Sequence, residues 1–192
     1  IIARDKALNQ QYRDRYPKAC RGKYSLAAPF MQCFWELAIA DDGYGRPAGY
    51  VGMITANSFM KRGFGRKLIE ELIPTWDLTH VIDTSHAIIP GHTTATVILF
   101  GRHQRPGSNT VRVASGIRSG DTVPTDPSKG EVWVALIGQL DNVDSQSVYV
   151  SVAEVERRRL ASHPWSMEEA ALQNSRSSST SQPPPASRTS CH

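Results

Sequence analysis

The clearest apolar pattern near the start of the chain is helical. Between about Ser25 and Ala40, large apolar residues recur at steps of three and four positions, which places them on one face of a helix. They are Leu26, Phe30, Phe34 and Leu37. The pattern predicts a helix whose apolar stripe is covered by a sheet or by another helix. A shorter helix is predicted over Asp5 to Tyr16, because this segment is rich in helix formers and Pro17 stops it.

Three short apolar runs, bounded by turn residues, predict buried strands. They are Tyr50 to Thr55, Leu78 to Asp83 and Ala95 to Gly101. The third run is so uniformly apolar that we expect both of its faces to be covered. Between the first two runs, a helix is predicted over Phe59 to Ile73, with a stripe that ends before Pro74. The stripe consists of Phe64, Leu68, Ile69 and Leu72.

The connections between these runs predict the topology. A strand, a helix and a second strand make a crossover unit that is long enough for two parallel strands. The segment from Thr84 to Thr94 is too short for a return helix, so the third strand is expected to run antiparallel. The predicted fold class is therefore α/β, with a mixed sheet that has an antiparallel strand near its end. Ligands of such sheets collect at the carboxyl ends of the parallel strands. We therefore expect one rim to gather Thr55, Asn57, Asp83, Thr84 and the loop from Ser85 to Thr94.

The pattern weakens after Pro106. Strands are predicted at Thr110 to Val113 and Val148 to Val152, a helix or strand at Lys129 to Leu140, and a basic helical turn at Val155 to Leu160. No chemistry is assigned to this part. The expected organisation is a main domain over residues 1–106, a weakly structured α+β extension over 107–169, and a disordered Ser/Pro-rich tail over 170–192.

Composition narrows the class of protein. The chain has 192 residues, of which 40% are hydrophobic, so a collagen-like or mainly disordered chain is excluded. Its three cysteines are far apart and show neither a disulfide framework nor zinc-ligand spacing, which favours a reducing compartment. No apolar run is long enough for a membrane span. A cytoplasmic protein without a membrane partner is therefore expected. The net charge of +4 is a mild indication of polyanion binding.

Motifs of catalysis are absent from the sequence. It has no Gly-x-x-x-x-Gly-Lys loop, no Gly-x-Ser-x-Gly elbow and no His-Glu-x-x-His pair, and its histidines show no metal-ligand spacing. The Ser85 to Thr94 loop is more informative, because a Pro90-Gly91 turn lies between His86 and His92. Basic residues at the start of the helix predicted over Phe59 to Ile73 either hold phosphate or form a solvated helix face. They are Lys61, Arg62, Arg66 and Lys67.

Two stretches carry a resemblance to a known family. The first is Tyr50 to Phe59 (YVGMITANSF), which Met60-Lys61-Arg62 follows, and the second is Thr79 to Arg102 (THVIDTSHAIIPGHTTATVILFGR). Both resemble N6-adenine-specific DNA methyltransferases, most of all the PglX type of BREX and phage-growth-limitation systems. The similarity extends upstream through Lys23 to Phe30 and Asp5 to Pro17, and more loosely downstream to His163-Pro164-Trp165.

The resemblance implies the second half of a Rossmann-like domain that uses S-adenosylmethionine and acts on double-stranded DNA in phage defence, with other defence proteins as further partners. In that family a glycine-rich donor loop and an Asn-Pro-Pro-Tyr motif hold the cofactor and the adenine. Neither is in this sequence, so no catalytic residue is assigned, and the motif is expected just upstream of Ile1. The rim residues implied for the target base are Asn57, Phe59, Ile88, Ile89, Pro90, Gly91 and His92, and those implied for DNA phosphate are Lys61 and Arg62. Since many relatives have an aromatic residue where this chain has Ile88 and Ile89, an apolar wall is the expected role of these two.

The chain is therefore expected to be a methyltransferase fragment that is inactive alone. Its start at Ile1 without a methionine and its Ser/Pro-rich end favour a fragment. Two alternatives stay open. One is a non-catalytic remnant that binds DNA or a partner through the same rim. The other is an unstable remnant without activity, because a half-sheet exposes an unpaired edge.

Overall fold

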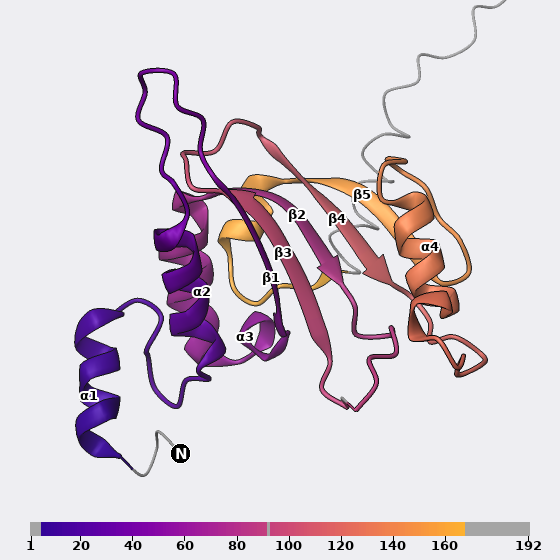
Figure 1. Ribbon diagram of the computed structural model, residues 1–192, viewed down its shortest axis with the longest axis horizontal. Helices are drawn as coiled ribbons and strands as arrows, with labels where there is room; N and C mark the ends of the chain where they lie inside the picture. Colours follow the sequence, from indigo (N-terminus) through magenta and orange to yellow (C-terminus); the bar gives the residue numbers. More distant parts are fainter. Residues whose placement is uncertain (1–4, 92, 168–192) are drawn as a thin grey trace, which may run out of the picture.

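The computed structural model describes residues 5–91 and 93–167, which fold around a single five-stranded sheet (Figure 1). The strands are β1 (Tyr50–Ala56), β2 (Asp77–Asp83), β3 (Thr96–Arg102), β4 (Thr110–Gly116) and β5 (Val150–Glu156). The α-helices are α1 (Lys6–Arg15), α2 (Ala27–Leu37), α3 (Ser58–Lys61) and α4 (Glu131–Gln139). No helix in this part of the chain has both the length and the apolar character needed to cross a bilayer.

The order of strands across the sheet is β1-β3-β2-β4-β5. Strand β3 runs antiparallel beside β2, as predicted. It also pairs antiparallel with β1 and so lies between the two, a position that the sequence pattern did not predict. Strands β1 and β2 therefore point the same way, and β4 joins them because it pairs with β2 in parallel. Strand β5 runs antiparallel at the far edge. The predicted mixed sheet is confirmed, and β4 and β5, which follow residue 106, belong to the same sheet.

The alternation of side chains along the strands divides the core into two clusters. On β3, Val97 and Leu99 belong to the larger cluster, whereas the intervening Ile98 packs against the smaller one. Helix α2 and the segment after α3 cover the larger cluster, and α4 covers the smaller one at the opposite side of Figure 1. The expectation that both faces of β3 are covered fails at Phe100, which is 40% exposed.

The segment after β1 is not the single helix that its apolar stripe predicts. It consists of α3, a 3-10 turn at Gly63–Gly65, a π-helical turn at Leu68–Leu72 and a second 3-10 turn at Ile73–Thr75. Gly65 permits the break, because without a Cβ it can lie directly against the backbone of Phe59. The stripe is nevertheless buried at three of its four positions, Leu68, Ile69 and Leu72, because helical turns of any type place these residues on one side.

Helix α2 buries a different face from the predicted one. The stripe from Leu26 to Leu37 is exposed: the exposed fraction is 40% at Leu26 and 73% at Leu37. The buried face carries Met31 and Trp35, and the Trp35 ring stacks on Trp76 at 4.4 Å between centroids. Both faces of this helix are apolar at helical spacing, so the sequence pattern alone selects the wrong one. The larger contact area of the tryptophan decides the orientation.

This orientation gives a simple stability prediction. Leu37→Gln is expected to change the free energy of unfolding by less than about 0.5 kcal/mol, because the side chain is already in water. Met31 on the same helix is fully buried, and Met31→Ala is expected to cost about 2–5 kcal/mol. Urea unfolding of the two variants measures both values. A larger loss for Leu37→Gln than for Met31→Ala would contradict the observed face.

Candidate functional site

The rim predicted from the strand directions exists. Because β1, β2 and β4 point the same way, the segments that follow them meet at one end of the sheet. The Asn57 side chain donates from Nδ2 to Ser85 Oγ at 2.9 Å, which joins the end of β1 to the loop after β2. The Ser85 backbone N–H and hydroxyl both donate to Asp83 Oδ1. These bonds make the junction a fixed polar corner.

The loop after β2 forms the predicted Pro-Gly turn. Gly91 has φ +72°, a left-handed conformation that glycine adopts without steric cost. His92 lies outside the described residues. At the start of this loop, Thr84 Oγ1 and Thr96 Oγ1 share a buried hydrogen bond of 2.7 Å, which ties the loop to β3.

The same loop also contacts helix α4, which sequence analysis left without a role. Trp133 donates from Nε1 to the Ile88 carbonyl oxygen at 3.0 Å. Loop and helix border a largely open apolar hollow of about 290 Å³. Its lining consists of Ile88, Ile89, Pro90, Pro127, Ser128, Trp133 and Ile137. The one sign of this site in the sequence is an aromatic residue, Trp133, within an apolar segment. The sequence does not show that it contacts Ile88, because the two residues are some 45 positions apart.

Phe59 does not reach the surface of the rim. Its side chain is 2% exposed and packs edge-on against Trp165, with 5.8 Å between the ring centroids. The expectation of direct contact with a base is therefore corrected for this residue, which supports the start of α3 from within the core. Asn57, Ile88 and Ile89 are partly exposed, and Pro90 and Gly91 are exposed.

The basic residues after α3 are available to a ligand. Lys61, Arg62 and Arg66 are exposed, and in the described part of the chain none of them pairs with an acidic side chain. Lys67 differs, because its Nζ lies 2.9 Å from Glu71. Three exposed cations without an acidic partner among the described residues therefore follow β1 along the chain.

The loop after β4 brings a carboxylate to the other end of the rim. Glu131, the first residue of α4, accepts from the Asp121 N–H at 2.6 Å and from the Tyr149 hydroxyl at 3.0 Å. The hydrogen bond to Glu131 is the main cause that raises the pKa of the Tyr149 hydroxyl above its usual value. The protonated Tyr149 hydroxyl holds the Glu131 carboxylate in place by this hydrogen bond, and Glu131 in turn stabilises the loop after β4 through the Asp121 N–H.

The opposite end of the sheet carries a polar pocket of about 350 Å³, but its charges are used internally. Asp77 accepts from Gln104 Nε2 at 2.8 Å and from Arg157 Nη2 at 3.2 Å. Arg157 also donates to the Leu78 and Ser108 carbonyl oxygens at 2.9 and 2.8 Å. Burial lowers the pKa of the Arg157 guanidinium. This network joins β2 to β5 and the β3–β4 connection.

Comparison with known proteins first defines the class of fold. No protein-family model matches the chain. The type IIG restriction endonuclease BpuSI shares the fold, with a TM-score of 0.50 and 15% identity over 82% of this chain and 18% of BpuSI. A modification subunit assigned to a type I restriction enzyme from Vibrio vulnificus gives a TM-score of 0.48 and 13% identity over 66% of this chain and 27% of that subunit. The predicted α/β fold class with a mixed sheet is confirmed, and BpuSI shares this fold.

One relative then makes the resemblance specific. The chain is 47% identical over 170 residues to the adenine-specific methyltransferase PglX of Streptomyces coelicolor. The match covers 86% of this chain and 14% of that protein. The resemblance to PglX-type adenine-specific methyltransferases that the sequence motifs indicated is confirmed.

Proposed function

We propose that this chain is the DNA-facing part of an adenine-specific DNA methyltransferase, which transfers a methyl group from S-adenosylmethionine to adenine N6 and serves in phage defence. The observation that carries the proposal is the 47% identity with PglX over most of this chain. The geometry of the rim supports it, because a fixed polar corner and an apolar loop lie along one end of the sheet, and exposed cations follow β1 along the chain. Double-stranded DNA is the proposed partner, with other defence proteins beside it in the cytoplasm.

The chemistry sets the task of such a rim. Methylation of adenine N6 needs the base out of the helical stack, which costs a few kcal/mol. The amino group must then be held in line with the methyl donor. We assign Lys61 and Arg62 to the DNA phosphates, and Asn57 with the Ile88 to His92 loop to the surroundings of the extruded base.

The donor itself is not held by the described residues. None of their strands is followed directly by a glycine-rich turn that opens a helix, which is the arrangement that binds such cofactors. The sequence also lacks Asn-Pro-Pro-Tyr. We therefore assign the S-adenosylmethionine site and the amino-group acceptor to a further part of the protein, and expect this chain alone to be inactive.

The proposed phosphate contacts give a prediction for DNA binding. Lys61→Ala combined with Arg62→Ala is expected to weaken DNA binding and to lower the slope of log K against log salt by about 2, because each of the two side chains neutralises one phosphate. Fluorescence anisotropy with a labelled duplex at several salt concentrations measures this slope. Lys67→Ala is the matched control, because Lys67 is already paired with Glu71. An equal slope for the double variant and the control would remove the two residues from the interface.

The function is tested by a chimera of the relative. The segment of Streptomyces PglX that matches this chain is replaced by this chain, and N6-methyladenine is measured in host DNA under donor excess. We expect methylation at the sites that the parent modifies, and none when the segment is deleted. A chimera that is folded, judged by its thermal unfolding, and yet leaves DNA unmethylated would contradict the proposal and favour a non-catalytic remnant.

A further inference from the structure

Helix α4 is apolar on all sides. Its sequence, EVWVALIGQ, contains one charged residue, and Val132 and Leu136 bury its inner face against the smaller core cluster. On the outer face Val134 is 56% exposed and Ile137 is 75% exposed. A helix that is apolar all round is typical of a buried position. Within the described ranges nothing covers this outer face.

The apolar hollow beside α4 continues this surface. Ile137 on the helix and Ile88 on the facing loop both line it, and Ser128 is the one polar residue of its lining. The only polar atom of the Trp133 side chain, Nε1, is already bonded to the Ile88 carbonyl oxygen. The indole therefore offers its apolar surface alone. The hollow can recognise shape and hydrophobicity, but it has few groups that could read the polar edge of a base.

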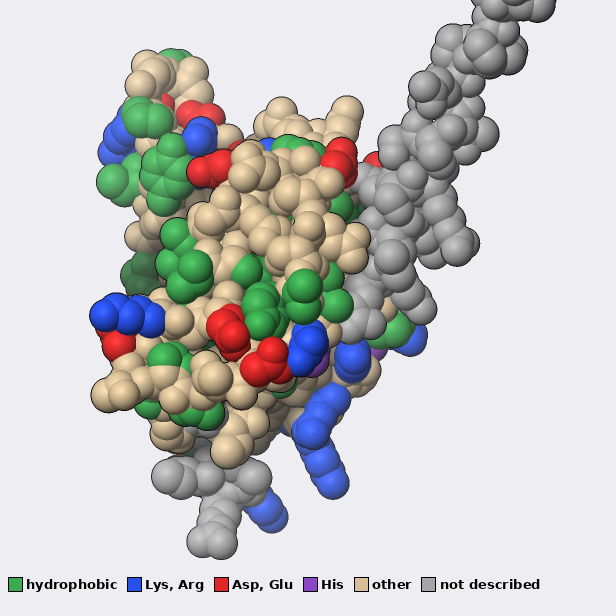
Figure 2. Space-filling model, turned by 90° about the vertical axis from the view of Figure 1, so that its right-hand side faces the viewer, with side chains coloured by type: hydrophobic (Ala, Val, Ile, Leu, Met, Phe, Trp, Pro, Cys, Tyr) green, Lys and Arg blue, Asp and Glu red, His purple; other side chains and the backbone are tan. Residues whose placement is uncertain are grey.

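The charges around the hollow argue against nucleic acid. Lys129 pairs with Asp126 at 3.8 Å, and Arg118 pairs with Asp121. Glu131 adds a further negative charge. Arg118 and Lys129 thus each have an acidic neighbour, which weakens the attraction of this surface for a phosphate. The face that carries α4 shows green apolar side chains beside red ones, and several blue side chains lie toward its lower right (Figure 2).

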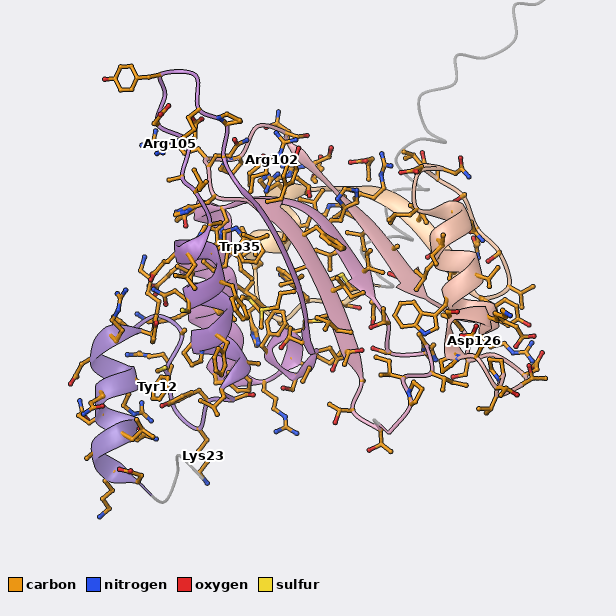
Figure 3. The ribbon with its side chains drawn as sticks, in the orientation of Figure 1. Tyr12, Lys23, Trp35, Arg102, Arg105 and Asp126 are labelled. Atoms are coloured by element: carbon orange, nitrogen blue, oxygen red, sulfur yellow. The ribbon has the colours of Figure 1, made fainter. Side chains whose placement is uncertain are left out.

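The hollow shares Ile88, Ile89 and Pro90 with the loop assigned to the surroundings of the extruded base, and α4 forms its other wall. Helix α4 contacts β5 and β4. Asn57 and Lys61 follow β1, and β3 and β2 separate β1 from β4 in the sheet. Figure 3 shows Asp126, near α4, on the opposite side of the sheet from α1 and α2.

We propose that this hollow is a docking site for a leucine- or phenylalanine-class side chain from another segment of a PglX-length polypeptide. The source of that segment rests on the proposed function, because this chain matches only 14% of PglX and most of such a protein lies outside the match. The occupant would cover Val134 and Ile137 and complete the burial that the composition of α4 requires. A single large anchor in a desolvated pocket with neutral surroundings is a common way in which protein surfaces associate.

The four tryptophans make the site directly observable. Trp35, Trp76 and Trp165 are at most 5% exposed, whereas Trp133 is half-buried at the hollow. In an ¹⁵N-correlation spectrum of the 192-residue chain, Trp133→Phe identifies the Trp133 indole N–H signal. We expect N-acetyl-leucinamide and N-acetyl-phenylalaninamide to shift this signal saturably. N-acetyl-glycinamide and adenosine serve as the polar probe and the base probe, and neither is expected to saturate the site.

A variant pair checks the location. Ile137→Asp is expected to weaken the binding of both apolar probes at least tenfold, because it places a charge at the mouth of the hollow. Val148→Asp is the control, since Val148 is 62% exposed and does not line the hollow. Preferential saturation by adenosine would overturn the proposal in favour of a nucleobase site. Absence of saturation by either apolar probe, or equal effects of the two variants, would also overturn it.

The source of the occupant is tested in the PglX chimera. A photoreactive benzoylphenylalanine at position 137 is expected to cross-link to another segment of the same polypeptide, identified by mass spectrometry. A cross-link to DNA, or none, would overturn the docking proposal even where the chimera methylates DNA. A folded chimera that cross-links internally but leaves DNA unmethylated would contradict the proposed function and keep the docking site. The two failures are therefore distinguishable.

Discussion

Replacing Asp77 with alanine is expected to lower the free energy of unfolding by about 3–5 kcal/mol, because it leaves the Arg157 guanidinium buried without its counter-charge. The side chains of Asp77 and Arg157 are only 8% and 16% exposed. The Asp77 carboxylate also accepts from Gln104 Nε2 and from the Gly107 N–H, which would lose their acceptor. Urea unfolding followed by far-UV circular dichroism measures the loss.

A second substitution separates charge from packing. Asp77→Ala together with Arg157→Leu removes both charges and is expected to recover part of the loss, since the stranded charge is gone. Asp126→Ala is the exposed control: Asp126 lies 3.8 Å from Lys129 and accepts from the Ser128 N–H and hydroxyl at the start of a 3-10 turn, so its loss is expected to cost only as much stability as the loss of a helix cap, well below the cost of Asp77→Ala. If Asp77→Ala were as mild as Asp126→Ala, the network would not be holding β2 to β5.

The directions of the first three strands could be predicted because they depend on local patterns and on loop length. The runs at Tyr50, Leu78 and Ala95 were apolar and bounded by turns, and the Thr84 to Thr94 connection was too short for a parallel return. The observed strands begin within one residue of these runs. The rim followed from strand direction alone. The hydrogen bond between Asn57 and Ser85 shows that the segments after β1 and β2 are in direct contact at this rim.

The parts that could not be predicted depend on contacts between distant residues. The buried face of α2 is decided by Trp35 stacking on Trp76, 41 positions away, and both faces of the helix were apolar at helical spacing. The hollow depends on a hydrogen bond between Trp133 and Ile88 that has no local signal. The family resemblance implied that Phe59 is a rim residue, yet its side chain packs against Trp165 in the core.

Two exposed surfaces of this chain, the edge strand β1 and the outer face of α2, favour association with other protein segments. Strand β1 is an edge of the sheet, with Tyr50 76% and Ile54 52% exposed. Helix α2 presents Phe30 and Phe34, whose rings stack at 6.1 Å between centroids, on its outer side. An uncovered edge strand and an apolar helix face both favour association. These surfaces agree with a chain that works within a larger protein, as proposed from its 14% coverage of PglX.

Gly65→Ala is expected to destabilise the protein by more than about 3 kcal/mol, because a Cβ at this position collides with backbone that cannot turn aside. An ideal Cβ on Gly65 would lie 2.6 Å from the Phe59 carbonyl carbon and 2.9 Å from its Cα, and closer still to the carbonyl oxygen. The clash forces apart the turn between α3 and the helical segment that follows. That turn carries Lys61 and Arg62, so the affinity for DNA is expected to fall together with stability.

Gly63→Ala tests the steric argument at nearly the same place. A Cβ on Gly63 would meet nothing within 4 Å, and its backbone is not in the left-handed region. The substitution also removes backbone entropy from the unfolded chain, so a neutral or slightly stabilising effect of up to about 1 kcal/mol is expected. Thermal unfolding and DNA anisotropy on both variants give the comparison. Equal losses at the two glycines would show that the turn needs flexibility at both positions, and would contradict a close approach at Gly65 as the feature that permits the broken helix.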